Sequence, residues 1–103
     1  MNQQANSQHY CLLQYFIEQN PPFGVRQVFG LVVLNGARHM IKSAPIKRVD
    51  EQWGLVYTQQ ASYQLGELIT DEAEKFLYRR VFCLSGKKIS DVQISTEVYM
   101  NVH

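Results

Sequence analysis

The stretch QVFGLVVLNGARHMIKSAPIKRVD, residues 27–50, decides the fold expected of this chain. Residues 28–34 are rich in aliphatic and β-branched side chains, which suit the pleated surface of a strand. Asn35-Gly36 follows, and because both residues tolerate a positive φ, this pair is a strong signal for a tight hairpin turn. Residues 38–42 are expected to return as the partner strand. The stretch therefore predicts a β-hairpin.

More strands are expected downstream of the hairpin, separated by Pro45 and by polar turns. We predict a short strand or bend and then three strands, at residues 46–49, 53–58, 63–65 and 91–103. The last of these, DVQISTEVYMNVH, alternates between apolar and polar residues, which is typical of a long, half-buried strand. If it lies at the edge of the sheet, its backbone groups are free to pair with another chain.

Two helices are predicted, one before all of these strands and one between the strands at 63–65 and 91–103. The first spans about residues 7–19, where Tyr10, Leu13 and Ile17 fall on one helical row and Pro21 and Pro22 end the helix.

The second helix spans about residues 71–84. Asp71 and Glu74 have the spacing of a capping box, which satisfies free N–H groups of the first turn. An amphipathic row then recurs at helical spacing, made up of Ala73, Phe76, Leu77, Val81 and Leu84. Arg80 falls on the same row; its stem could extend to solvent, pair with a buried carboxylate or reach across a subunit interface.

Together these elements predict an α+β fold: a mostly antiparallel sheet of five to six strands with two helices, at about 7–19 and 71–84. The short central strands could curl into a small, partly open barrel that the helices cover on one face or one end. A chain of 103 residues forms one domain, residues 1–103, in which residues 1–6 are expected to be a frayed tail.

Composition and charge argue against several functional classes. A hydrophobic content of 46% supports one core and argues against a disordered chain. The net charge of +1 is low for a dedicated nucleic-acid binder. No apolar run approaches the roughly 18 residues of a membrane span, and the polar N-terminus lacks a secretion signal, so we expect a cytoplasmic protein with no membrane association. Cys11 and Cys83 lie in apolar segments and are expected to be buried, reduced thiols.

Part of the chain resembles a family of small bacterial domains found in prophage and other mobile-element genes. The resemblance covers FGLVVLNGARHMIKSAPI (29–46), LVYT (55–58) and SYQLG (62–66), the last with a Tyr-x-Leu-Gly motif. Ala44, which separates Ser43 from Pro45, departs from the pattern of the family. The resemblance implies an accessory role and a barrel-like sheet, and it assigns no catalytic residues.

The sequence shows no arrangement of reactive groups that would indicate an enzyme. His9, His39 and His103 lie in three separate segments, so a metal site would require distant residues to converge. The acidic residues at the start of the second helix are explained by the helix dipole. No Gly-rich phosphate loop and no Gly-x-Ser-x-Gly motif is present. We therefore expect a protein that is not an enzyme and that needs no cofactor and no metal.

Three sets of residues are candidates for binding. The basic residues could form a surface for nucleic acid, and they are Arg38, Lys42, Lys47, Arg48, Arg79 and Arg80. Aromatic residues between the helices and the sheet could line a pocket for a small ligand, and they are Phe16, Trp53, Tyr57 and Phe76. The last strand could join two copies through Val98, Met100 and Val102.

We expect a small non-enzymatic accessory protein, associated with a mobile element, that acts by protein–protein binding and forms a homodimer. A nucleic-acid-binding module and a small-ligand-binding protein are the two alternatives.

Overall fold

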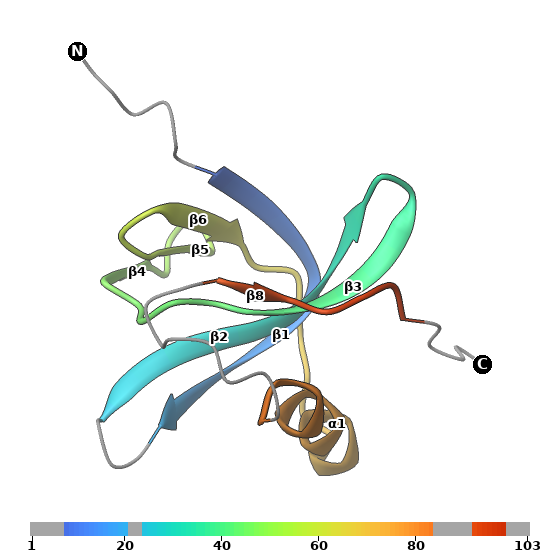
Figure 1. The fold of residues 1–103 in the computed structure, drawn as a ribbon. Coiled ribbons are helices and arrows are strands. Elements are labelled where there is room, and N and C mark those ends of the chain that lie inside the picture. Colours follow the sequence, from blue (N-terminus) through green and yellow to red (C-terminus); the bar gives the residue numbers. More distant parts are fainter. Residues whose placement is uncertain (1–7, 21–23, 84–91, 99–103) are drawn as a thin grey trace.

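The computed structural model describes residues 8–20, 24–83 and 92–98. Within these ranges the chain forms an α+β domain of one helix and eight strands, some only two or three residues long (Figure 1). The elements are β1 (Gln8–Asn20), β2 (Val25–Leu34), β3 (Ala37–Lys42), β4 (Arg48–Asp50), β5 (Leu55–Tyr57), β6 (Ala61–Gln64), β7 (Glu67–Leu68), α1 (Glu72–Cys83) and β8 (Gln93–Ile94).

The strands form one sheet in the order β4-β5-β6-β1-β2-β3-β8, and β7 pairs with β1 beside this path. Neighbours are mostly antiparallel, as predicted, but β1 runs parallel to both β6 and β7. The hydrogen-bonded path is open, with β4 and β8 at its two ends among the described residues, and the sheet has eight strands, not the predicted five to six.

The predicted hairpin at residues 28–42 is confirmed. Leu34 pairs with Ala37 across the turn, and Asn35 and Gly36 adopt φ values of 53° and 79°. These left-handed conformations give a two-residue turn whose twist matches that of the flanking strands. Trp53, predicted to begin a strand, lies instead in the turn before β5.

The prediction of a first helix at residues 7–19 is wrong, because this segment is the strand β1. Its aromatic and aliphatic residues suit a strand as well as a helix. A short apolar run does not show whether the apolar residues repeat with the period of a helix or with that of a strand. The pairing partners decide the outcome. β1 pairs with β2 along most of its length and contacts β6 with its first four residues.

A β-bulge between Leu12 and Gln14 reverses the faces of β1. Before the bulge, Tyr10 and Leu12 point into one apolar cluster; beyond it, Phe16 points into the other, on the opposite face of the sheet. Because the sense of alternation changes at the bulge, no single period describes the sequence of β1.

The sheet has a hydrophobic cluster on each face. The first contains residues of β1, β2, β3, β5 and β6, so β5 and β6 fold over the central strands. The second lies under α1 and contains Phe16, Phe29, Leu31, Met40, Ile69, Tyr78 and Phe82. Val28 and Phe29, adjacent on β2, belong to different clusters. The middle of β2 is thus buried on both faces, which explains its continuous apolar sequence.

The long C-terminal strand predicted at 91–103 is also wrong in its described part. Only Gln93 and Ile94 form the strand β8, although the segment does lie at the sheet edge. After it, Ser95 and Val98 donate backbone hydrogen bonds to the carbonyls of Met40 and Arg38, at 2.9 and 2.8 Å. The segment follows β3 with an irregular register. Residues 99–103 lie outside the described residues.

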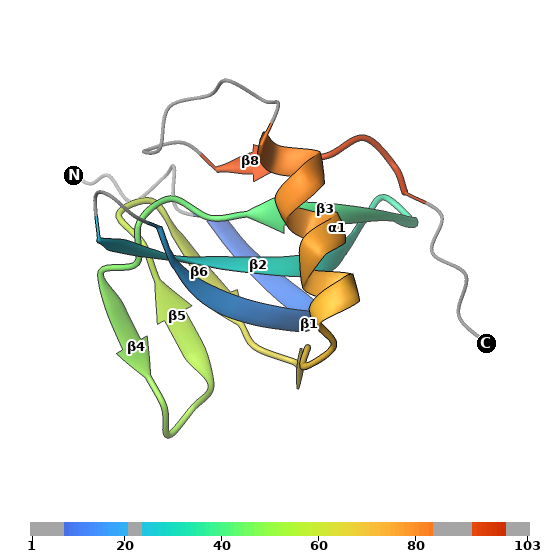
Figure 2. The same ribbon diagram turned by 90° about the horizontal axis from the view of Figure 1, so that it is seen from below.

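The second predicted helix is confirmed as α1 and lies across one face of the sheet (Figure 2). Asp71 caps it, since its carboxylate accepts a hydrogen bond of 2.9 Å from the backbone N–H of Ala73. The predicted end at Leu84 lies outside the described residues. No helix of the described residues is long and apolar enough to span a membrane.

Candidate functional site

The side of α1 that faces away from the sheet is largely apolar. Phe76, Leu77 and Val81 are 53%, 47% and 40% exposed, and the exposed residues Ala73 and Arg80 lie between them on the helical surface. We call these five residues the outer face of α1. Exposed apolar side chains gathered on one helix face are typical of an interaction surface, whereas scattered ones are not.

The predicted amphipathic row of this helix therefore faces outward in its described part, and not toward the core. The core side is formed by Tyr78 and Phe82, which are 0% and 5% exposed. An apolar stripe covers one side of an ordinary surface helix. In α1, apolar residues occupy two sides of the helix, but only one side can pack against the sheet. The sequence therefore contains more apolar residues in this helix than the core can bury, and this surplus is the signal that could have revealed the outer face.

Contacts on the inner side of α1 fix its position. The hydroxyl of the buried Tyr78 accepts a hydrogen bond of 3.2 Å from Gln14 Nε2, and the ring of Phe16 packs edge-on against Tyr78 at 5.6 Å. Burial raises the pKa of Tyr78, while this hydrogen bond from Gln14 lowers it. These contacts hold α1 against the sheet and leave its outer face exposed to solvent.

An ion pair adds to this attachment. Arg79 Nε donates to both carboxylate oxygens of Glu18 on β1, at 3.0 and 2.9 Å. These hydrogen bonds raise the pKa of Arg79, so the guanidinium stays charged. Because both side chains are about one-third exposed, we expect the pair to contribute modestly to stability.

Acidic residues lie at the start of α1, where Glu72 pairs with Lys75 Nζ of its own helix at 3.1 Å and lies 3.8 Å from Arg79 Nη2. Asp71 and Glu72 lie at its start, and the Glu72 side chain is 75% exposed. Arg80 lies in the last turn, with its guanidinium 5.9 Å from the centre of the Phe76 ring. The stem of Arg80 therefore extends along the outer face, and its charge stays at the surface.

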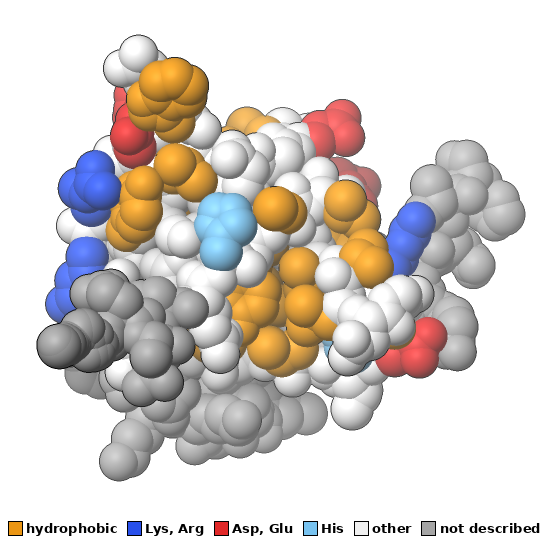
Figure 3. All heavy atoms as spheres, turned by 90° about the horizontal axis from the view of Figure 1, so that it is seen from above, with side chains coloured by type: hydrophobic (Ala, Val, Ile, Leu, Met, Phe, Trp, Pro, Cys, Tyr) orange, Lys and Arg blue, Asp and Glu red, His pale blue; other side chains and the backbone are white. Residues whose placement is uncertain are grey.

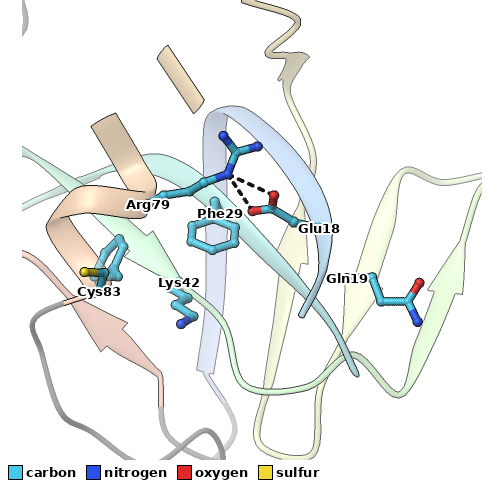
Figure 4. Close-up of a pocket in the computed structure, with 7 residues that line it drawn as sticks. Glu18, Gln19, Phe29, Lys42, Arg79 and Cys83 are labelled. Carbon is cyan, nitrogen blue, oxygen red and sulfur yellow. Dashed lines mark hydrogen bonds and ion pairs between the residues drawn. The ribbon is translucent and has the colours of Figure 1, made fainter. Parts of the chain in front are cut away.

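The structure brings two of the six predicted basic residues to one groove. Lys42 and Arg79 line a groove of about 330 Å³ beside the end of α1, together with Glu18, Gln19, Phe29, Phe82 and Cys83. Figure 4 shows the Arg79 guanidinium turned toward Glu18 and away from Lys42. The only carboxylate of the groove is thus bound to Arg79, and the two cations do not converge.

The remaining basic residues lie elsewhere. Lys47 precedes β4, and Arg48 is its first residue, with its guanidinium 4.1 Å from the centre of the Tyr57 ring. Arg38 lies on β3. On the face opposite α1, the visible Lys and Arg side chains lie at opposite edges, with hydrophobic and uncharged side chains between them (Figure 3). A continuous track for a phosphate backbone is not formed there.

The four residues of the predicted ligand pocket do not meet in one cavity. Phe16 is buried under α1, Phe76 lies on the outer face of α1, and Trp53 is 66% exposed in the turn before β5. Tyr57 lines a different, small hollow of about 180 Å³ near the β5–β6 turn. Of the residues of the predicted dimer strand, Val98 packs against the cluster under α1, and Met100 and Val102 lie outside the described residues.

The histidines and cysteines do not form a reactive centre in the described ranges. His9 Nδ1 lies 2.7 Å from Ser62 Oγ on the neighbouring strand, an exposed pair, and no carboxylate of the described residues is bound to the ring, as it would be in a catalytic triad. His39 Nδ1 lies 2.9 Å from the carbonyl of Ser95. No three His, Cys, Asp or Glu side chains of the described residues group as metal ligands.

Cys11 and Cys83 are free thiols, and both are exposed. The prediction that they are buried is wrong. Cys11 lies on the solvent side of β1, and Cys83 ends α1.

Comparison of the chain with protein-family models, with curated proteins and with solved structures finds no match.

Proposed function

We propose that this chain is a small accessory protein that acts by binding another protein, and that the outer face of α1 is its contact surface. One observation carries the proposal: Phe76, Leu77 and Val81 are each exposed by 40% or more on the same side of one helix. The mobile-element role implied by the resemblance of residues 29–66 is part of this proposal.

The energy available from this surface supports the proposal. Complete burial of such a side chain is worth about 1.5–3 kcal/mol, so burying the exposed half of each contributes about 1 kcal/mol. Phe76 is an aromatic side chain and Arg80 lies beside it; both types are enriched at binding interfaces. The packing of Tyr78 against Phe16 and Gln14 holds the helix in place before binding, which lowers the entropy cost of association.

The alternative of nucleic-acid binding has less support. Arg79 is neutralised by Glu18, Arg48 is stacked on Tyr57, and these two arginines lie on different elements, α1 and β4. Affinity for nucleic acid depends on several cations that meet consecutive phosphates.

Affinity capture from cells of the source organism tests the proposal. The tagged chain is compared with a Phe76→Ser, Leu77→Ser double variant and with Leu68→Ser. Leu68 is 55% exposed on β7, so its variant removes a similar exposed apolar side chain that is not part of the outer face of α1. We expect proteins retained by the original chain to be retained by Leu68→Ser and lost from the double variant.

Folding is checked by thermal melting, because substitutions at exposed positions should change stability by only about 0.5 kcal/mol. If a folded double variant retains the same proteins as the original chain, the outer face of α1 is not the contact surface.

A further inference from the structure

The outer face of α1 is complementary to itself when two copies meet in opposite directions. We propose that a second copy of this chain occupies this face, with the two α1 helices packed antiparallel about a two-fold axis. This inference rests on the proposed function, because it names the partner of the same surface.

The spacing of the residues defines the contact. An α-helix rises about 1.5 Å per residue, so a two-fold axis between Phe76 and Leu77 brings residues whose numbers add to the same total to the same height. Phe76 then meets Leu77 of the partner subunit, and Ala73 meets Arg80 of the partner subunit. The smallest side chain of the face lies opposite the longest one, which leaves room for the arginine stem.

The charges favour the antiparallel direction. In a parallel pair, Arg80 would meet Arg80 of the partner subunit, and Glu72 would meet Glu72 of the partner subunit. In the antiparallel pair, each Arg80 approaches the start of the other helix, where Asp71 and Glu72 lie. Opposite charges at the two ends of one surface thus select the orientation.

Arg80 gains a role in this arrangement. Its guanidinium is 5.9 Å from the Phe76 ring, and the residue is exposed. In the dimer the stem covers the apolar contact, and the charge reaches Glu72 of the partner subunit, whose 75% exposed side chain also pairs with Lys75 of its own helix at 3.1 Å. An arginine at the centre of an apolar helix face is thus accounted for.

The contact is small, so the dimer is weak. One helix face buries less than the roughly 800 Å² per partner of a standard interface, and we expect a Kd of about 10–100 μM. Sedimentation equilibrium over a concentration range around this value should show reversible dimerisation. Leu77→Asp should weaken it at least tenfold, and the matched variant Leu68→Asp on β7 should leave it unchanged.

A charge-exchange experiment tests the pairing of Arg80 with Glu72. Arg80→Glu alone and Glu72→Lys alone should each dimerise more weakly than the original chain. A mixture of the two variants should form a heterodimer, because both cross-pairs are then attractive. Equal association of each variant alone and of the mixture would overturn the pairing.

Disulfide trapping tests the direction, in a Cys11→Ser, Cys83→Ser background that removes the exposed thiols. Leu77→Cys lies next to the axis and should cross-link to itself. Ala73→Cys should not, since the two copies are about 10 Å apart along the helix axis, beyond disulfide reach. Self-cross-linking of Ala73→Cys would refute the antiparallel arrangement.

The outcomes separate the two proposals. A monomer at all concentrations, whose capture of other proteins still depends on Phe76 and Leu77, overturns the dimer and leaves the proposed function. A dimer that persists unchanged in Leu77→Asp and shows no Leu77→Cys cross-link overturns the inference about this face.

Discussion

Replacing Gly66 by alanine should destabilise the fold more than the same change at Gly30, the other glycine of the described residues that lacks a positive φ. A Cβ at this position would lie 2.3 Å from the carbonyl oxygen of Leu12 and 2.5 Å from that of Leu13. Ordinary contact begins at 3.4 Å, so the two backbones must separate by about 1.1 Å. Both neighbouring atoms belong to the main chain of β1, and a change of side-chain rotamer cannot relieve the clash.

The backbone of residue 66 would push against β1 at Leu12 and Leu13, where the bulge lies. Beyond the bulge, Gln14 and Phe16 contact Tyr78, so a shift there also loosens α1. Overpacking of this kind costs about 1–3 kcal/mol. In a domain of this size, each kcal/mol lowers Tm by about 4–8 °C. We therefore expect Gly66→Ala to lower Tm by about 5–20 °C, measured by circular dichroism.

Gly36→Ala is the matched control. It has no atom within 4 Å of an added Cβ, and its φ of 79° makes the substitution costly through backbone conformation alone, by about 1 kcal/mol. If Gly66→Ala melts within about 1 °C of the original chain, or above Gly36→Ala, the close approach of residue 66 to β1 is not a determinant of the fold.

Two further predictions concern buried polar groups. Ser43 is fully buried, and its Oγ accepts a hydrogen bond of 2.9 Å from the N–H of Val28. Ser43→Ala should therefore lower the free energy of unfolding, measured by urea titration, by about 1–3 kcal/mol. An unchanged urea midpoint would show that this N–H finds another partner. Burial raises the pKa of Tyr63 far above its ordinary value of 10, so the unfolded chain releases this proton at a lower pH than the folded chain does. The free energy of unfolding should therefore not depend on Tyr63 below pH 10 and should fall as the pH rises above 10. The loss attributable to Tyr63 is about 1.4 kcal/mol per pH unit, and Tyr63→Phe should remove that part of the slope between about pH 10 and 11; an unchanged slope would show that this phenol does not control alkaline unfolding.

Local signals in the sequence predicted two parts of the fold correctly. Asn35-Gly36 specifies the hairpin because its backbone preference acts within the turn itself. Asp71 specifies the start of α1 because a cap needs only the next two or three residues. Both signals act over a few residues, so they do not depend on the rest of the chain.

The candidate site was predicted only in its composition. The helical spacing of Phe76, Leu77, Arg80 and Val81 predicts one amphipathic row, but it does not predict that this row is exposed. Which side of α1 meets the sheet is decided by the fit of Tyr78 and Phe82 against Phe16 and Phe29. This fit depends on the bulge in β1, about 60 residues earlier in the chain.

The amino-acid sequence alone predicts a hairpin at residues 28–42, a helix that begins after Asp71, and enough apolar residues for one small domain. The strand at residues 8–20 and the exposure of the outer face of α1 become apparent only in the folded chain. The physical reason is that both outcomes depend on competition between partners: β1 is held by hydrogen bonds to β2 and β6, and α1 can bury just one of its two apolar sides.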